Sequence, residues 1–483
     1  MGIMKKIFSN IMYNGIYQLL IIVLPFITVP YISRVLGAES VGVYSYVNSI
    51  PTFLSVVILM GMNQLGAREI AQSNRETIWS RFLGLWKIQA FVGVVVIILY
   101  TLVVIFTLDY KFYFLLEVPF LIGYILDISW FFIGLGEIKK VVIRNTSIKL
   151  ILITSIFIFV HNPDDLWIYV LINSITYLAN IIFWFSLKHE IKLIQTIDIT
   201  PTKIKFNYWK KAIIVAIPMI ATQLYTSFDQ TLVKWLAGAV QLAYYSQSQM
   251  IARAVVGVVT SVSMVLMPKM AQIQASGDSE NHNKSIFKLV KISLDYTAIV
   301  ALYFTAALMI NSAVFVPWFY GTKFTDMTQN MFWVSLIVIF ISYGGVFANQ
   351  YTLSQGKYVK FAIPYLIGAI FSILANIFLV PLYGSLGATG VIVGTELIVC
   401  LLRIVLVIGD FKKVGIFNDQ LKYILTFIIT LGLGLLLPIR VSNPLVTLIA
   451  QTILSTIVYF VLLIVLKTRV TNDGKQLLRR IKR

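Results

Sequence analysis

Basic residues are distributed along this chain in a way that strongly restricts its fold. If the chain crosses a membrane fourteen times, 33 of its 39 Lys and Arg residues fall on one side, including the group Lys139, Lys140, Arg144 and Lys149. The exceptions on the other side are Arg34, Lys111, Lys323 and Arg440. Lys234 and Arg253 fall within the membrane. Cytoplasmic loops carry such an excess of basic residues, so we expect a multi-pass protein of the cytoplasmic (inner) cell membrane with both termini in the cytoplasm.

Composition supports the same conclusion. Hydrophobic residues make up 59% of the chain and charged residues only 12%, whereas soluble proteins average about 25% charged residues. The net charge of +19 is spread over short loops between apolar stretches, so we expect anionic membrane lipids and no nucleic acid as its partners. The single cysteine, Cys400, excludes a disulfide framework and a paired-cysteine metal site.

Apolar stretches of about 20 residues, long enough to cross a bilayer, recur along the whole chain. They predict an all-α membrane protein with about fourteen transmembrane helices, near residues 9–30, 41–61, 83–107, 112–134, 141–160, 166–187, 212–237, 243–268, 292–316, 329–353, 361–380, 387–409, 423–439 and 445–466. The outer connections between them are short. Little room is left for an outer catalytic domain of the kind that membrane glycosyltransferases and polymerases carry.

A weak internal repeat suggests how these helices are grouped. The expected turn at Leu36-Gly37 resembles the one at Ala237-Gly238, and similar residues follow each of them. Many transporters are built from two such halves. We therefore predict an N-lobe over 1–205 with helices 1–6, a C-lobe over 206–410 with helices 7–12, and a final segment over 411–483 with helices 13–14 and a basic cytoplasmic tail.

The sequence contains no recognisable arrangement for covalent chemistry. The three histidines lie in expected loops, and no glycine-rich phosphate loop follows a strand. Gly390 and Gly394 form a small-residue pair that is typical of helix packing. We expect no catalytic residue, metal or cofactor, and a protein that moves a molecule instead of converting it.

Two expected spans carry polar stripes that are candidates for lining a ligand cavity. The seventh span has, at helical spacing, Gln223, Ser227, Gln230 and Lys234. The first span has Asn10, Asn14, Gln18, Pro25 and Thr28. Each stripe has an alternative interpretation. Lys234 extends to the outer head groups and has no further role, and the polar groups of the first span merely bond neighbouring helices.

Four further ionisable residues lie within expected spans, where a charge costs at least about 2.5 kcal/mol. Asp229 and Arg253 lie at equal depth on adjacent spans, so they could form a structural ion pair or a pair that opens during transport. Asp127 and Glu396 have no partner at helical spacing on their own spans. Their alternatives are pairing with another helix or coupling to a proton or cation.

Several motifs resemble one family of membrane proteins, the polysaccharide (Wzx-type) lipid-linked oligosaccharide flippases of the MOP superfamily. Three stretches of this chain look like the start of these flippases: the one from Leu24-Pro25-Phe26 to Arg34-Val35-Leu36-Gly37, then Gly42-Val43-Tyr44-Ser45, and then Gly66-Ala67-Arg68-Glu69-Ile70-Ala71. The start of its second half is resembled by Phe228-Asp229-Gln230 and Ala243-Tyr244-Tyr245-Ser246. In length and span number the resemblance covers essentially the whole chain.

The resemblance implies two six-helix bundles in a V-shaped arrangement around a cavity that opens alternately to either side. The implied substrate is an undecaprenyl-diphosphate-linked oligosaccharide repeat unit, moved to the outer leaflet for a surface polysaccharide such as capsule or O-antigen. A cationic cavity would neutralise the diphosphate, and the candidate head-group residues are Arg34, Lys234 and Arg253. Asp127, Asp229 and Glu396 are candidates for coupling to a proton or sodium gradient or to the membrane potential. A polysaccharide polymerase is a candidate partner.

Two alternatives remain at this point. A multidrug or cation antiporter of the same superfamily should carry acids in the cavity of its first lobe, whereas the first span here has none and the unpaired charge tends to be positive. A membrane polymerase or glycosyltransferase is disfavoured by the short outer loops.

Overall fold

The computed structural model describes residues 2–74, 76–107, 109–193, 206–264, 279–411 and 415–471; the side chains of residues 2–19 and of a few short stretches lie outside this description. Over these ranges the chain forms helices and turns and no strand, which confirms the all-α class. It divides into two compact units, Met1–Lys234 and Trp235–Arg483. The seventh expected span packs with the first unit, while the division into six, six and two helices stays a prediction, as does a V-shaped arrangement.

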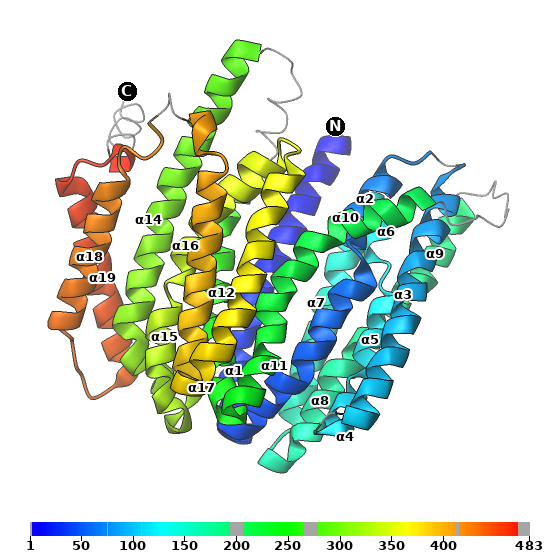
Figure 1. Cartoon of the computed structure of the whole chain (residues 1–483), viewed down its shortest axis with the longest axis horizontal. Helices are drawn as coiled ribbons and strands as arrows, with labels where there is room; N and C mark the ends of the chain where they lie inside the picture. The colour runs from blue at the N-terminus through cyan, green and yellow to red at the C-terminus, as the bar shows by residue number, and fades with distance from the viewer. Residues whose placement is uncertain are drawn as a thin grey trace. The chain divides into compact units, whose positions relative to one another are not determined.

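The helices of the N-terminal unit pack lengthwise against one another (Figure 1). An aromatic core centred on Phe82 and Trp130, both fully buried, joins α2, α3, α6, α9 and α10. The helices are α1 (Gly2–Leu59), α2 (Met62–Ala71), α3 (Ile78–Thr107), α4 (Lys111–Leu116), α5 (Val118–Leu126), α6 (Ser129–Gly134), α7 (Ile138–Phe159), η1 (Pro163–Asp165), α8 (Leu166–Ile175), η2 (Thr176–Asn180), α9 (Ile181–Leu193), α10 (Phe206–Gln223), η3 (Leu224–Phe228) and α11 (Asp229–Ala237).

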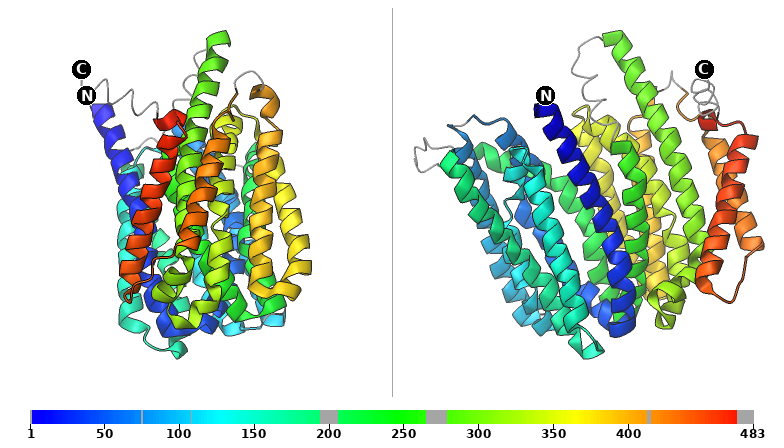
Figure 2. Two further views of the ribbon diagram at one scale, coloured as in Figure 1. Left: turned by 90° about the vertical axis from the view of Figure 1, so that its left-hand side faces the viewer. Right: turned by 180° about the vertical axis from the view of Figure 1, so that it is seen from behind.

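The C-terminal unit is built around the long helix α14, which packs against α12, α15, α16, α18 and α19. Its last two helices form a hairpin beside α14, coloured orange to red in Figure 2. The helices of this unit are α12 (Ala239–Met264), α14 (Ser279–Tyr320), η4 (Thr322–Met327), α15 (Thr328–Val334), α16 (Ile337–Gly345), η5 (Val346–Leu353), α17 (Tyr358–Val405), η6 (Ile408–Phe411), α18 (Gln420–Leu436) and α19 (Pro444–Val465).

Among the described residues, ten helical stretches are long and apolar enough to cross a membrane. Two of them, Val23–Ala71 and Val359–Val405, have 49 and 47 residues, about twice the length that one crossing needs. Each contains a break, so each corresponds to two expected spans. Helix α12 and the shorter α18 lie at two further expected spans. The multi-pass helical class is confirmed, and the count of fourteen crossings stays a prediction.

Glycines with positive φ make the breaks between these helices. Gly37 interrupts α1 with φ 76°, Gly384 interrupts α17 with φ 56°, and Gly238 separates α11 from α12 with φ 90°. Residues with a side chain rarely adopt such angles, so glycine is required there. Gly37 and Gly238 are the two turn glycines that the internal repeat aligns, and both have the conformation that such a turn needs.

The small-residue pair in α17 does not pack as expected at both positions. A methyl group at Gly394 would lie 3.5 Å from the Phe371 ring, but one at Gly390 would meet no atom within 4 Å in the part of the chain that the structure describes. Gly390 instead lines an apolar cavity of about 350 Å³ with Trp333 and Tyr383. The packing interpretation is therefore wrong for Gly390 within this unit.

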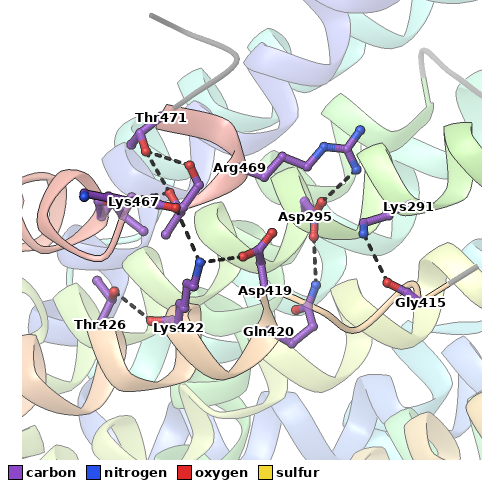
Figure 3. A network of polar contacts seen from close by, with 12 residues as sticks. Lys291, Asp295, Gly415, Asp419, Gln420, Lys422, Thr426, Lys467, Arg469 and Thr471 are labelled. Atoms are coloured by element: carbon purple, nitrogen blue, oxygen red, sulfur yellow. Dashed lines mark hydrogen bonds and ion pairs between the residues drawn. The ribbon is translucent and has the colours of Figure 1, made fainter.

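A polar network holds the C-terminal hairpin against α14 (Figure 3). Asp295 of α14 is buried, and its carboxylate accepts a hydrogen bond from Gln420 Nε2 at 3.0 Å and pairs with Arg469 Nη1 at 3.5 Å. Farther along the hairpin, Tyr459 donates to the carbonyl of Ile299 at 2.9 Å. Hydrogen bonds between helices compensate for the burial of polar groups in an apolar surrounding, so this network fixes the hairpin in register.

We predict that Gly384→Ala destabilises the protein by about 1–2 kcal/mol, because alanine would hold a strained backbone conformation there. Its methyl group would also lie 2.8 Å from Gln241 Oε1, which accepts a hydrogen bond from the Ser385 amide. Gly257→Ala is the matched control, since a methyl group at that helical position meets no atom within 4 Å in the described structure. Thermal unfolding in detergent measures both, and an unchanged Gly384→Ala midpoint would contradict this account of the turn.

We also predict that Asp295→Ala destabilises the C-terminal unit by about 1–3 kcal/mol, the cost typical of removing a partner from buried polar groups. Lys422→Ala should cost less than about 0.5 kcal/mol, because its pair with Asp419 is partly exposed and lies within one turn of chain. Thermal unfolding and limited proteolysis of the hairpin provide the measurement. Equal loss in both variants would mean that the buried network does not hold the hairpin.

Candidate functional site

Lys234 lies near the end of α11 and is enclosed by aromatic rings. Its Nζ is 4.7 Å from the centroid of the Tyr46 ring and 5.0 Å from that of Tyr110. Asp109 Oδ2 lies 3.6 Å away, but the Asp109 side chain is 83% exposed while that of Lys234 is only 13% exposed. A cation over aromatic faces is stabilised without being neutralised. Lys234 is therefore held in a defined position and does not simply extend toward the membrane surface.

The second half of α1, which carries Tyr46, also bonds neighbouring helices close to Lys234. Asn48 donates to Glu117 Oε1 at 3.3 Å, and the hydroxyls of Ser49 and Thr231 lie 2.7 Å apart. Glu117, at the junction of α4 and α5, is completely buried. Glu117 was not among the candidates predicted from the sequence. It lies within the expected span 112–134, and an acid within a span is the signal by which the other acidic candidates were found.

Arg34, unlike Lys234, is exposed. Its Nη1 donates to the carbonyl of Pro30, one turn back along the same helix, at 2.8 Å. Arg34 itself lies three residues before the break at Gly37.

Arg253 pairs with an acid on another helix of its own unit. Its Nη2 lies 3.5 Å from Glu396 Oε1, and its Nε donates to Gln249 Oε1 at 3.1 Å. The Arg253 side chain is 33% exposed and that of Glu396 only 4%. Glu396 therefore has the cross-helix partner that its own span could not supply. Asp229 is completely buried in the N-terminal unit, so the expected Asp229–Arg253 pair would join the two units and stays a prediction.

Asp127 lies at a break in the fourth expected span. Helix α5 ends at Leu126, α6 begins at Ser129, and Asp127 Oδ1 accepts a hydrogen bond from the Ser129 amide at 2.9 Å. A bond from an aspartate to the amide two residues further on forms an Asx turn, which here precedes the N-cap of α6, Ile128. The structure thus gives Asp127 a local bonding role, and its part in ion coupling stays a prediction.

Side chains from two other helices bond the carbonyl groups that this break leaves open. Gln89 Nε2 donates to the carbonyls of Tyr124 and Asp127 at 2.7 and 2.9 Å. The indole nitrogens of Trp86 and Trp184 donate to the carbonyls of Ile125 and Leu126 at 3.1 and 2.9 Å. Non-helical backbone at membrane depth requires such partners.

The polar stripe of the seventh span does not continue on one helical face. A π-helical turn, η3, occupies Leu224–Phe228, and such a turn adds a residue and changes the phase of the helix. Gln223 Oε1 accepts bonds from Thr226 and Ser227 at 2.7 and 3.1 Å, and Gln230 donates to the Thr226 carbonyl at 3.3 Å. These groups bond along their own helix, and the side chains of Asn14 and Gln18 lie outside the described residues.

Lys149 was counted with the cytoplasmic cations although it falls inside the expected span 141–160. The structure places it eleven residues into α7 (Ile138–Phe159), about 17 Å from its start at 1.5 Å per residue. It lies at the middle of the helix and not in a loop. The spacing of Arg144, Asn145, Ile148 and Lys149 on one helical face is the sequence signal that a count of loop charges misses.

Arg34 and Lys234 belong to the N-terminal unit and Arg253 to the C-terminal unit. A head-group site formed by all three would need both units and stays a prediction. Within the N-terminal unit, the structure shows Lys234 with the rings of Tyr46 and Tyr110, here called the Lys234 cage. Within the C-terminal unit, it shows the Arg253–Glu396 pair.

Comparisons with known proteins agree with this architecture. Residues 7–274, more than half of the chain, match the family described as "Polysaccharide biosynthesis protein". A putative O-antigen transporter of Shigella dysenteriae is 24% identical over 386 residues, which cover 78% of this chain and 94% of that protein. Another putative O-antigen transporter, from Escherichia coli (strain K12), is 21% identical over 404 residues, covering 82% and 96%.

Two solved structures show the same fold at low sequence identity. The lipid II flippase MurJ, in an inward closed conformation, aligns with a TM-score of 0.74 and 16% identity over 94% of this chain and 98% of that one. An inward-facing multidrug resistance MATE family transporter of the MOP superfamily aligns with a TM-score of 0.58 and 14% identity over 83% and 99%. The chain therefore belongs to the polysaccharide biosynthesis protein family, and its resemblance to Wzx-type flippases of the MOP superfamily is confirmed.

Proposed function

We propose that this protein is a flippase that moves undecaprenyl-diphosphate-linked oligosaccharide repeat units from the inner to the outer leaflet of the cytoplasmic membrane by alternating access. The observation that carries the proposal is Lys234, a cation held over two aromatic rings beside the exposed Asp109, in a protein whose relatives are named putative O-antigen transporters over nearly their whole length. The cargo would serve export of a surface polysaccharide such as capsule or O-antigen.

The diphosphate of such a cargo needs positive partners while its sugars cross an apolar region. Lys234 suits this role because its acid neighbour, Asp109, is 83% exposed and lies 3.6 Å away, and an ion pair with an acid open to solvent contributes little energy. An arriving diphosphate can replace it at small cost. Arg34 presents an accessible charge in the same unit, and Arg253 is the third candidate for the head group.

Glu396 is a proposed site of coupling to an ion gradient. Glu396 is buried against the partly exposed Arg253, so protonation of its carboxylate would release the guanidinium for an anionic group. Asp127 and Asp229 are alternative coupling residues. A proton gradient, a sodium gradient or the membrane potential could each supply the energy.

The alternatives have less support. The likeness to a MATE transporter is one of fold at 14% identity, whereas the family match and the relatives concern polysaccharide export. The matched proteins are named as transporters and flippases and not as enzymes, which disfavours a polymerase or glycosyltransferase. A polysaccharide polymerase is a candidate partner, as are the surrounding membrane lipids.

Deletion of the gene in its host should leave lipid-linked repeat units in the inner leaflet and abolish the surface polysaccharide. Extraction of undecaprenyl-linked glycans, with their accessibility to an impermeant lectin on intact spheroplasts, measures this. Normal export of fully polymerised glycan from the deletion strain would contradict the proposal.

We predict that Lys234→Gln reduces export about tenfold or more, because charge-assisted hydrogen bonds contribute about 1.5–3 kcal/mol. Lys234→Arg, which keeps the positive charge, should retain part of the export activity. Lys111→Gln is the matched control, since it removes the same charge from an exposed lysine of the neighbouring helix α4. Asp109→Asn should change export less than about twofold. Export by Lys234→Gln at the level of Lys111→Gln would exclude Lys234 from the head-group site.

A further inference from the structure

A polar cavity lies inside the N-terminal unit, away from the residues assigned to the head group. It has a volume of about 300 Å³ and lies between α5, α7, α8 and η2. This is at the lower end of the volumes of small-molecule sites. Three of the residues that line it are charged: Asp127, Arg144 and Lys149.

Lys149 is the unusual member of this group. It lies at the middle of an apolar helix, lines the cavity, and makes no hydrogen bond or ion pair with any residue that the structure describes. A charged side chain at such a depth is costly, and those that persist pair with another group or mark a path for a substrate or an ion. An ammonium group that faces a cavity without a partner is therefore available for an anionic ligand.

The second cation of the cavity is held in place. Arg144 donates to Asn145 Oδ1 at 2.6 Å and to Asn180 Oδ1, and its guanidinium lies 4.5 Å from the centroid of the Phe183 ring. Asn180 in turn donates to the Gly123 carbonyl at 2.8 Å. These bonds fix the position of the guanidinium.

The negative charge of the cavity does not balance these two cations. Asp127 is the acid that lines it, and one of its oxygens is committed to the Ser129 amide. One carboxylate against a guanidinium and an ammonium leaves the cavity positive. Opposite charge is what a site for an anion requires.

The remaining walls suit a ligand with hydroxyl groups. The rings of Tyr124 and Tyr177 stack with their centroids 5.4 Å apart, and both residues line the cavity together with Asn173 and Thr176. Tyrosine, amide and hydroxyl groups provide flat apolar surface and hydrogen bonds side by side.

We propose that this N-unit cavity binds an oxyanion carried by a hydroxylated molecule, with Lys149 as its direct ionic partner and Arg144 as the fixed second cation. The ligand chemistry is a carboxylate or phosphate next to hydroxyl groups. An acidic sugar and the phosphoglycerol head group of a lipid both present it. The site is separate from the Lys234 cage, and binding there does not depend on whether the protein moves lipid-linked glycans.

The test measures binding to the purified full-length protein in neutral-lipid nanodiscs. Glucuronate and glycerol 1-phosphate are the free probes, glucose is the neutral control, and nanodiscs with phosphatidylglycerol supply the lipid source. We expect at least one anionic probe to raise the unfolding temperature in a saturable way and glucose to have no such effect. Lys149→Met should weaken this binding about tenfold or more, whereas Lys140→Met, at the exposed start of α7, should retain it.

Saturation by a free probe would identify a soluble anionic group as the ligand, and stabilisation by phosphatidylglycerol alone would identify a lipid head group. In case Lys149→Met does not fold, reductive methylation of Lys149 in the wild-type protein, followed by mass spectrometry, gives a second measurement. The bound anion should slow methylation of Lys149 and leave that of Lys140 unchanged. The proposal is overturned if no anion binds better than glucose, or if anions bind without any effect of Lys149→Met or protection of Lys149.

Discussion

Every backbone amide and carbonyl group that leaves regular helix inside an apolar surrounding must find another partner, and the N-terminal unit depends on how this is met at Asp127. The chain stops being helical there in the middle of an expected span. Gln89 bonds two of the open carbonyls, tryptophan side chains bond two more, and the Asp127 carboxylate bonds the Ser129 amide. The break also brings Tyr124 and Asp127 to the wall of the polar cavity.

Charges within the spans follow the same rule with different partners. Lys234 has aromatic rings and the exposed Asp109, Arg253 has the buried Glu396, and Arg144 has two amide oxygens. Rings and amides stabilise a cation but leave its charge in place. The two acids differ in exposure, because the Asp109 side chain is 83% exposed and that of Glu396 only 4%. The Lys234 pair therefore opens at smaller cost than the Arg253 pair.

Hydropathy and the distribution of basic residues were sufficient to predict the helical class, and the family motifs were sufficient to predict the family. The turn glycines Gly37 and Gly238 were predictable because only glycine adopts their backbone angles readily. The break at Asp127 was not, since no glycine or proline marks it and its partners come from distant helices. The Glu396 partner of Arg253 was likewise invisible at helical spacing. The π turn at Leu224–Phe228 altered the face that a regular helix would have given to Gln223 and Lys234. Lys149 lay inside the expected span 141–160 but was missed as a cavity residue, because the other walls of its cavity come from α5, α8 and η2.

The central claim is that Lys234, with Arg34 and Arg253, holds the diphosphate of a lipid-linked glycan while it changes leaflet. The most direct measurement is transbilayer movement of a fluorescent undecaprenyl-diphosphate oligosaccharide in proteoliposomes, detected by an impermeant quencher. The account predicts rapid loss of fluorescence with the protein, slowed by excess unlabelled lipid diphosphate and unaffected by a lipid that carries the same glycan without phosphate. Equal movement of the phosphate-free lipid, or no movement above that of protein-free vesicles, would contradict it.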